Sequence, residues 1–412
     1  MSTSRIVVTG IGATSPIGGT APESWDALLS GASGARTLEH DWVEEYQLPV
    51  TFAAEALVRP ETVLERPVAK RLDPSSQLAM VAAKEAWEDA GSPDIDPDRL
   101  GVDFATGIGG VWTLLDAWDT LREKGPRRVM PMTVPMLMPN AAAGNLSLHF
   151  NARAFARTVA SACASSTESI VNAVQHIRDG LADVVIAGGT ESAIHPITIA
   201  SFASMQALSK RNDSPETASR PGSIDRDGFV MGEGAGVLIL ETEEHAKARG
   251  AKIYASIVGG GVTADSYHIT ANDPEGRGAA RAVRLALDMA GVSVDDVTHI
   301  NAHATSTPVG DPNEYQALRA VFGARVDEIP VSATKASTGH LLGGTGALEA
   351  IFTVLALQNR VAPPTINLTE QDPEVPFAIS GSPVELGSGD QLAISNSFGF
   401  GGHNAVVAIA SV

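Results

Sequence analysis

The sequence predicts an α/β protein built from two similar halves. Continuous apolar runs, ADVVIA at 182–187 and AGVLILE at 235–241, indicate strands that are covered on both faces. An internal echo indicates a duplication, because SACASS at 161–166 and SATKAST at 332–338 each follow a strand-like run and precede a long apolar helical segment. A repeat this far apart is too long for a solenoid period, so we expect two related α/β units.

The first element that we expect is a short buried strand at 5–9, RIVVT, which Gly10 and Gly12 stop. The glycine-rich stretch after it does not match a dinucleotide-binding fingerprint. Ser15 stands at the position of the third glycine, and no acidic residue follows at the position that would bind the ribose. We therefore reject dinucleotide binding.

An amphipathic helix is expected next. Asp73 is suited to cap its start, Pro74 suits its first position, and Gly91 closes its end. Between them, SSQLAMVAAKEAWEDAG places apolar residues at helical spacing. This helix is expected to cover the sheet.

Composition narrows the class of protein. No stretch approaches the roughly 18 consecutive apolar residues that span a bilayer, and the N-terminus lacks the pattern of a signal peptide, so we expect a cytoplasmic protein. The net charge of −19 argues against nucleic-acid binding, because neutralising phosphates requires a basic surface. A single cysteine excludes an internal disulfide and a site made of several thiolates.

That cysteine, Cys163, lies between the β-compatible run TVAS at 158–161 and an apolar helix. A thiol at a helix start faces free backbone N–H groups and the positive end of the helix dipole, which favour the thiolate and lower its pKa. A lone cysteine is also often an inert buried hydrophobe. From position alone, the two interpretations are evenly matched.

His303 and His340 lie at comparable junctions. His303 follows the strand-like VTHIN and enters a loop, whereas His340 precedes the second long helix. Such junctions converge at the carboxyl ends of strands, so we expect one pocket that contains Cys163 and both imidazoles. A cysteine with histidine suits acyl transfer. Zinc binding is the weaker alternative, because these residues lack the short spacing of most zinc ligands.

The segment NSFGFGGHN at 396–404 surrounds Phe398 and Phe400 with glycines. Such a loop lets backbone N–H groups approach a ligand closely and stabilise an oxyanion. A plain hairpin turn accounts for the same residues equally well.

Six segments together resemble the β-ketoacyl-[acyl carrier protein] synthases of type I/II, and most of all synthase II. In order along the chain they are VTGIGATSPIG, SACASS, ASRPGSIDRDGFVMGEGAGVLILE, NAHATSTPVGD, SATKASTGHLLGGTGALEA and NSFGFGGHN. The resemblance implies a thiolase fold of five αβαβα layers, with a nucleophile-bearing half at 1–250 and a histidine-bearing half at 251–412. It also implies a homodimer that works without cofactor or metal, and acyl carrier protein as the partner.

The resemblance further implies an activity. Cys163 would carry an acyl chain, and His303 and His340 would promote malonyl decarboxylation and stabilise the resulting enolate. The enolate would attack the acyl thioester and lengthen a fatty acid by two carbons. Lys335, with Glu349 as its partner, would tune the electrostatics of the site.

Further roles follow from the same resemblance. The backbone N–H groups of Cys163 and Phe400 would form the oxyanion hole, and Phe400 would also gate the thiol. Other substrate contacts are expected from Ile108 and Phe202 in the acyl pocket, from Thr270, Thr305 and Thr307 along the pantetheine arm, and from Phe398. Candidate docking residues for the carrier protein are Arg66, Lys70, Arg71, Arg127 and Arg128.

The chain departs from the family pattern at three positions. Ala304 replaces a usual glycine and His403 a frequent threonine, neither of which should abolish the chemistry. Gln206 stands where related enzymes often present an arginine to the carrier protein, which leaves the docking surface open.

Several alternatives differ from this interpretation. Non-catalytic chain-length factors lack the active cysteine, thiolases need a second catalytic cysteine, and initiating type III synthases pair cysteine with histidine and asparagine. Cys163 argues against the first, the single cysteine of the sequence against the second, and His340 against the third. Within the family, primary fatty acid elongation, very-long-chain or mycolic-type elongation and aromatic polyketide synthesis all stay open.

Overall fold

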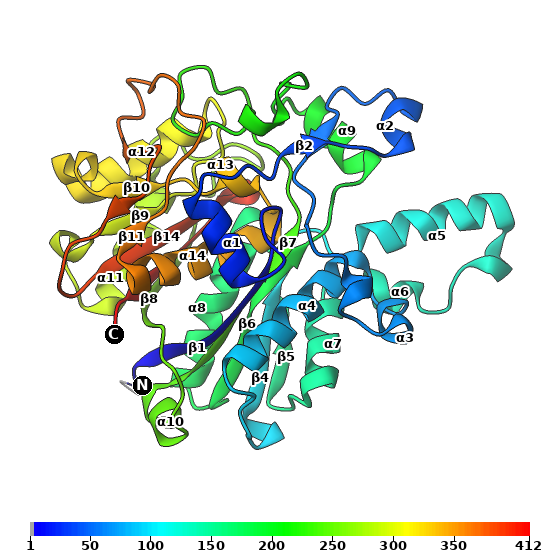
Figure 1. Ribbon diagram of the computed structural model, residues 1–412, viewed down its shortest axis with the longest axis horizontal. Coiled ribbons are helices and arrows are strands. Elements are labelled where there is room, and N and C mark those ends of the chain that lie inside the picture. Colours follow the sequence, from blue (N-terminus) through cyan, green and yellow to red (C-terminus); the bar gives the residue numbers. More distant parts are fainter. Residues whose placement is uncertain (1–3) are drawn as a thin grey trace.

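One mixed sheet of eleven strands runs through the molecule (Figure 1), in the order β12-β10-β9-β14-β15-β8-β1-β7-β6-β4-β5. The structure, a computed structural model, describes residues 4–412. The strands of this sheet are β1 Ile6–Thr14, β4 Leu100–Ala105, β5 Phe155–Arg157, β6 Val184–Glu191, β7 Gly234–Thr242, β8 Ala255–Ala264, β9 His299–Asn301, β10 Pro330–Ser332, β12 Ala378–Ile379, β14 Leu392–Gly399 and β15 His403–Ala410.

Helices cover the sheet, and two short two-stranded sheets lie outside it. The α-helices are α1 Ala21–Leu29, α2 Asp41–Glu45, α3 Arg66–Ala69, α4 Pro74–Asp89, α5 Val111–Lys124, α6 Thr133–Leu137, α7 Ala141–Phe150, α8 Ser165–Arg178, α9 Pro196–Ser204, α10 Glu243–Ala248, α11 Arg277–Ala290, α12 Gly310–Phe322, α13 Lys335–Thr338 and α14 Thr345–Asn359. The small antiparallel sheets pair β2 Arg36–Thr37 with β3 Phe52–Ala53, and β11 Val361–Ala362 with β13 Val384–Glu385.

The sheet consists of two copies of one topology. In the first half, β4 runs parallel to β5 and β6, and β7 and β1 follow as antiparallel neighbours. In the second half, β9 runs parallel to β10 and β14, and β15 and β8 follow as antiparallel neighbours. A short antiparallel pairing of β1 with β8 joins the copies. The predicted duplication is confirmed.

The register of the duplication differs from the sequence echo. The helix equivalent to α8 is α14, and each follows a 3₁₀ turn, Ala162–Ala164 in the first half and Leu342–Gly344 in the second. The first residues of these turns share a left-handed backbone, with φ of 50° at Ala162 and 49° at Leu342. Cys163 therefore corresponds to Gly343, whereas SATKAST leads into the separate helix α13.

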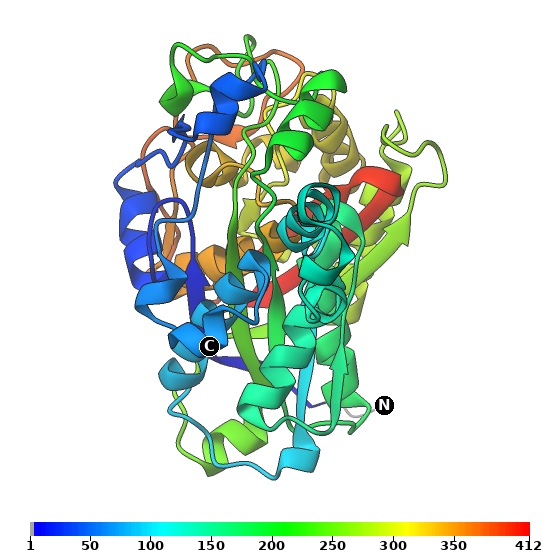
Figure 2. The same ribbon diagram turned by 90° about the vertical axis from the view of Figure 1, so that its right-hand side faces the viewer.

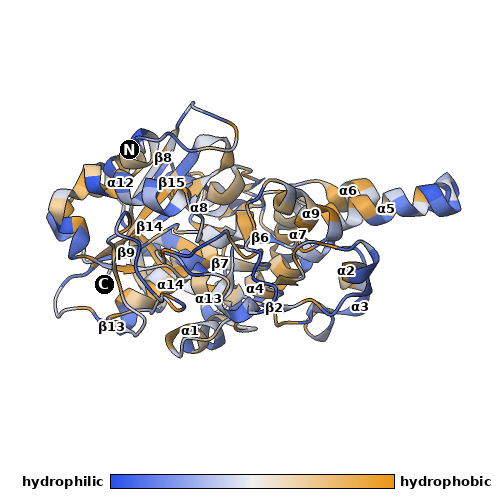
Figure 3. Ribbon diagram, turned by 90° about the horizontal axis from the view of Figure 1, so that it is seen from above, coloured by the Kyte–Doolittle hydropathy of each residue, from blue (hydrophilic) through white to orange (hydrophobic). Residues whose placement is uncertain are grey.

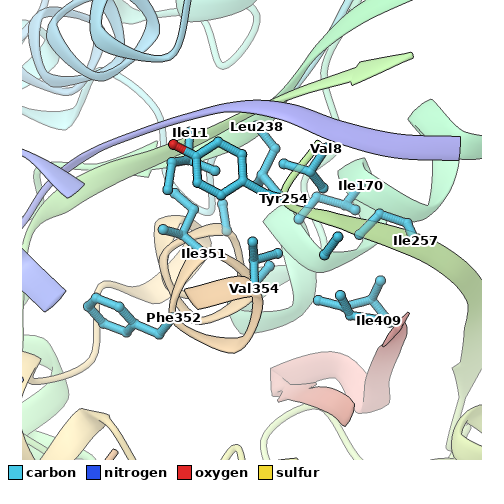
Figure 4. Packing of buried hydrophobic residues seen from close by; sticks show 14 of the residues in the cluster. Val8, Ile11, Ile170, Leu238, Tyr254, Ile257, Ile351, Phe352, Val354 and Ile409 are labelled. Atoms are coloured by element: carbon cyan, nitrogen blue, oxygen red, sulfur yellow. The ribbon is translucent and has the colours of Figure 1, made fainter. Parts of the chain in front are cut away.

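Five layers result from this arrangement. The helices α8 and α14 lie between the two sheet halves and contact strands of both. On the outer faces, α4 and α7 cover the first half, while α11, with α12 packed on it, covers the second. Figure 4 shows the apolar core around α14, where buried side chains of α8, α14 and both sheet halves meet: Ile170, Ile351, Val354, Val8, Leu238, Ile257 and Ile409. The predicted αβαβα layering is confirmed.

The first strand is longer than predicted. Instead of stopping at Gly10 and Gly12, β1 continues to Thr14. The glycines serve a close approach of α4, since a Cβ on Gly10 would lie 2.2 Å from the carbonyl oxygen of Ala86 and one on Gly12 would lie 2.1 Å from that of Ala82. They are packing residues inside a strand, which a local reading mistakes for a turn.

Other local predictions agree with the structure. The Asp73 side chain accepts a hydrogen bond from Ser75 N at 2.9 Å and caps α4, and Pro74 is its first residue. The predicted run at 235–241 lies within β7, and β6 begins at Val184 and continues to Glu191. Within residues 4–412, no helix is long and apolar enough to cross a membrane.

One helix stands apart from the layers. The arm of α5 projects at the right of Figure 1, is seen end-on in Figure 2 and points away from the body in Figure 3. Several apolar side chains along this arm and on α6 and α7 are exposed, among them Trp118 at 54%, Val134 at 61% and Leu148 at 82%.

Candidate active site

Cys163 lies in the 3₁₀ turn that leads directly into α8. The run before it is not a strand, because β5 ends at Arg157 and residues 158–161 are irregular. Ser165 shapes the turn, since its hydroxyl accepts from Ser161 N at 2.8 Å and donates to Ala162 O at 2.6 Å. The thiol is thus at a helix start, as predicted, but enters it from a loop.

The expectation of a lowered thiol pKa is wrong. Burial raises the pKa of Cys163 to about 11, which outweighs the backbone N–H of Phe400 and the charge of Lys335, both of which lower it. The free energy needed to desolvate the thiolate is larger here than the stabilisation that the nearby donors and the lysine charge provide. The resting group is therefore a thiol, and an attack on a thioester requires a base.

The structure brings both predicted histidines to this thiol. One ligand atom from each of Cys163, His303 and His340 can be chosen so that all lie within 4.8 Å of one another. The imidazole centroids are 5.5 Å apart, with the rings nearly perpendicular. The three residues therefore meet at one place, as expected, although Cys163 follows an irregular segment and His340 follows α13, so neither comes directly after a strand.

Both imidazoles are neutral. Burial lowers the pKa of His303 and of His340 well below the usual value, and the charge of Lys335 lowers both further. Nδ1 of His340 lies 2.9 Å from the Thr345 hydroxyl, whereas its Nε2 is buried without a partner in the described chain. Nδ1 of His303 is likewise buried and unpartnered. The site therefore holds neutral imidazole nitrogens that are free to bind a substrate.

Glu314 positions the His303 loop and was missed by sequence reasoning. Its carboxylate accepts from His303 N at 2.8 Å, from Ala304 N at 2.6 Å and from the Asn396 side chain at 3.0 Å. The bond to Ala304 uses only its backbone N–H, so the replacement of the usual glycine leaves it intact. An acidic residue in the helix after the loop is a signal too common to have singled it out.

A buried ion pair lies beside the imidazoles. Lys335 Nζ donates to Glu349 Oε1 at 2.6 Å, and both side chains are 1% exposed. Burial raises the pKa of Glu349 to about 7, although Lys335 acts to lower it. The lysine charge also weighs against the zinc alternative, because a dication at the Cys–His–His cluster would lie beside a buried cation.

The glycine-rich segment is a hairpin turn and also a close approach of backbone to the nucleophile, the two alternatives that its sequence left open. It forms the turn between β14 and β15, with a 3₁₀ turn at Phe400–Gly402. It also approaches the nucleophile, since a Cβ on Gly399 would lie 2.9 Å from Cys163 N. The backbone N–H groups of Phe400 and of Cys163 itself both act to lower the pKa of the thiol, which places them near its sulfur.

The predicted substrate residues lie on several elements around this centre. Phe202, on α9, packs against Phe229, with centroids 5.4 Å apart, and Phe229 packs against His340 at the same distance. Phe398 lies 6.0 Å from His303. Ile108 follows β4 and is 39% exposed. Phe229 lies between Phe202 and His340, and its sequence motif gave no sign of this position.

The three threonines lie further out. The hydroxyls of Thr305 and Thr307 are 3.0 Å apart at the end of the His303 loop. Thr270 lies on the exposed segment 265–275, which contacts the Phe400 turn through Gly401 N and Ile269 O at 2.7 Å. No contact joins Thr270 to the other two in the described structure.

The candidate docking residues gather at two neighbouring elements. Arg66, Lys70 and Arg71 lie in and after α3, and Arg127 and Arg128 lie in a 3₁₀ turn after α5. All five are exposed. Lys70 and Arg128 line one cavity of about 300 Å³, together with Asp116, so the two clusters lie near each other.

Comparisons with known proteins agree with this geometry. The N-terminal domain of β-ketoacyl synthases matches residues 3–246 and the C-terminal domain matches residues 254–369. The chain is 46% identical over 406 residues to 3-oxoacyl-[acyl-carrier-protein] synthase 2 of Staphylococcus aureus strain N315, covering 98% of this chain and 97% of that protein. It is 43% identical over 404 residues to the Mycobacterium bovis protein of the same name, covering 98% and 96%.

Solved structures share the whole fold. A β-ketoacyl synthase from Burkholderia phymatum superposes with a TM-score of 0.91 at 35% identity and covers 100% of both chains. A ketosynthase of a type II polyketide synthase, solved in complex with its acyl carrier protein, gives a TM-score of 0.91 at 31% identity and 99% coverage of both chains. With its two halves and five layers, the chain has the thiolase fold and belongs to the β-ketoacyl synthase family.

Proposed function

We propose that this chain is a 3-oxoacyl-[acyl carrier protein] synthase of type II, which elongates a Cys163-bound acyl chain by decarboxylative Claisen condensation with malonyl-[acyl carrier protein]. One observation carries the proposal, namely the approach of one half-buried thiol and two neutral imidazoles to within 4.8 Å. In this proposal, residues 1–250 supply the nucleophile and residues 251–412 supply both histidines.

The first half-reaction transfers the acyl group. The sulfur of Cys163 attacks the thioester carbonyl, and the N–H groups of Cys163 and Phe400 stabilise the oxyanion. Because the thiol pKa is about 11, a neutral imidazole must take its proton, which then leaves with the pantetheine thiol of the carrier protein. The acyl chain is left on Cys163.

The second half-reaction forms the carbon–carbon bond. Malonyl thioester loses CO2, and the negative charge that develops on its thioester oxygen requires hydrogen-bond donors. A neutral imidazole carries one N–H group, so His303 and His340 can each donate a hydrogen bond to that oxygen. The enolate carbon then attacks the Cys163 thioester, the C–S bond to Cys163 breaks, and the departing thiolate takes a proton from solvent.

The partner is acyl carrier protein, and we propose that it docks on the basic patch at Arg66, Lys70, Arg71, Arg127 and Arg128. Local positive charge is needed because the whole chain carries −19, which repels an acidic partner at long range. The polyketide ketosynthase of similar fold, which was solved with its acyl carrier protein, supports a carrier-bound substrate.

The active form is a homodimer in this proposal. The edge strand β5 ends the sheet, and α5, α6 and α7 beside it expose Trp118, Val134 and Leu148. Such a patch is typical of a buried interface. Trp118→Glu should shift the protein toward monomer in sedimentation, whereas Leu285→Glu, on the outer helix α11, should not. If wild type, Trp118→Glu and Leu285→Glu sediment equally, the interface lies elsewhere.

Replacing the nucleophile tests the activity itself. Cys163→Ser should abolish condensation of acyl- and malonyl-loaded carrier protein in a gel or mass-spectrometric assay of the product. Continued elongation by this variant would exclude the mechanism. Wild-type assays with acyl chains of graded length then separate primary fatty acid elongation from very-long-chain or polyketide synthesis.

A further inference from the structure

Glu191 is a buried carboxylate that the roles above leave unexplained. It is the last residue of β6, and its side chain is 0% exposed. Burial raises its pKa. Every partner that the structure of residues 4–412 records for its two oxygens is an N–H or O–H group.

Its two oxygens bind two different segments. Oε1 accepts from the Thr106 hydroxyl at 2.8 Å and from Ile108 N at 3.2 Å. Oε2 accepts from Gly107 N at 2.7 Å and from Gly343 N at 3.0 Å. Hydrogen bonds to a carboxylate are stronger than neutral ones, so four of them form a rigid clamp.

The clamped segments carry two separate parts of the proposed site. Residues 106–108 leave the carboxyl end of β4 and lead to Ile108 in the proposed acyl pocket. Gly343 belongs to the turn between His340 and α14. The two backbones touch, since a Cβ on Gly343 would lie 2.1 Å from Gly107 N and 2.8 Å from Glu191 Oε2.

We propose that Glu191 is a positioning residue that fixes the Ile108 wall of the acyl pocket relative to the His340 turn. This inference rests on the proposed function. Glu191 acts through the backbone of residues 107, 108 and 343. Because Ile108 lines the proposed acyl pocket, the position of this backbone sets how long an acyl chain the pocket accepts. A looser wall at Ile108 would admit chains that the clamped wall excludes.

The carboxylate also acts on the nucleophile through its charge. The Cys163 thiol faces the cation of Lys335, which lowers its pKa, the anion of Glu191, which raises it, and the two neutral imidazoles. Neutralising Glu191 should therefore move the alkylation of Cys163 to lower pH. A purely structural role would not produce this change.

Glu191→Gln tests the inference, because glutamine keeps the shape but presents an NH2 group to one pair of donors. The assays are kcat/KM for acyl carrier proteins of graded chain length, and the rate of iodoacetamide alkylation against pH. The preference for the best chain over one two carbons longer should fall about tenfold, as expected when a pocket loses its fit to a methylene group. The alkylation profile should shift to lower pH.

Glu233→Gln is the matched control. Glu233 is also a buried carboxylate, with a pKa raised by burial to about 6, but it accepts from Ser192 Oγ at 2.8 Å and from Ala56 N at 3.3 Å and touches neither clamped segment. Its replacement should leave the chain-length preference unchanged.

An unchanged chain-length preference in folded Glu191→Gln overturns the inference, whether or not its stability has fallen. If that variant does not fold, Thr106→Val removes a single donor and should shift the preference in the same direction; an unchanged preference there overturns it as well. These results differ from failure of the proposed function, which Cys163→Ser would reveal in an otherwise wild-type protein.

Discussion

Replacing Lys335 by methionine removes the cation of the buried ion pair and leaves Glu349 alone. The two side chains are 1% exposed and joined by a bond of 2.6 Å, so the lost partner is not replaced by water. Removing one member of such a pair typically costs about 3–5 kcal/mol. We expect a loss of this size in the free energy of unfolding at pH 8.5.

The loss should depend on pH in a defined direction. The folded-state pKa of Glu349, about 7, is above its ordinary value of 4.5, so this group stabilises the fold fully below pH 4.5 and ceases to do so as pH rises through 7. In wild type, the difference between the folded-state pKa of about 7 and the ordinary value of 4.5 corresponds to about 3 kcal/mol in the free energy of unfolding. Without Lys335 the pKa rises further, so the lone carboxyl is protonated at pH 5.5 and the variant should lose less stability there.

Chemical denaturation at pH 5.5, 7 and 8.5 measures the effect. The double variant Lys335→Met/Glu349→Gln is the control, since it contains no lone carboxylate and should lose the pH dependence. The reasoning is refuted if Lys335→Met matches wild type at pH 8.5, or if its deficit is the same at pH 5.5.

Other predictions concern the reacting groups. The rate of Cys163 alkylation by iodoacetamide should keep rising with pH beyond pH 9, because its thiol pKa is about 11; a plateau near pH 7 would contradict the burial argument. Glu314→Gln should slow CO2 release from malonyl carrier protein by about tenfold or more, because one N–H of the His303 loop loses a charged acceptor; an unchanged rate would show that the loop keeps its position without Glu314. Reversing the charge of Arg127 and Arg128 should raise KM for carrier-bound substrate and leave Cys163 alkylation unchanged, and an unaltered KM would place the docking surface elsewhere.

Features that depend on local sequence were predictable. The cap of α4 is set by Asp73 and Pro74, which act on neighbouring backbone, and its position agrees with the structure. The duplicated topology was visible as strand, small-residue turn and apolar helix. Its register was not, because the second half inserts α13 before the turn that corresponds to Cys163.

Features that depend on distant neighbours were not predictable. The role of Gly10 and Gly12 in β1 is set by the backbone of α4, about seventy residues away in the chain. The direction of the Cys163 pKa shift follows from burial, which a helix-start argument does not contain.

The candidate site was predicted in part. Cys163 and His340 were predicted to meet because each precedes a long helix, and His303 because it follows a strand, whereas Glu314 and Glu191 have no local signature. Both are carboxylates whose partners are backbone N–H groups of other elements, and only the folded chain shows those partners.

The shared left-handed turns at Ala162 and Leu342 carry different residues at their next position. The first turn carries the thiol of Cys163, and the second lies between α13 and α14. Gly343, at the place of the cysteine, has no room for a side chain, because a Cβ would lie 2.1 Å from Gly107 N. A cysteine at position 343 would therefore force the two backbones apart, so the packing of the second turn keeps the thiol chemistry of this chain in the first.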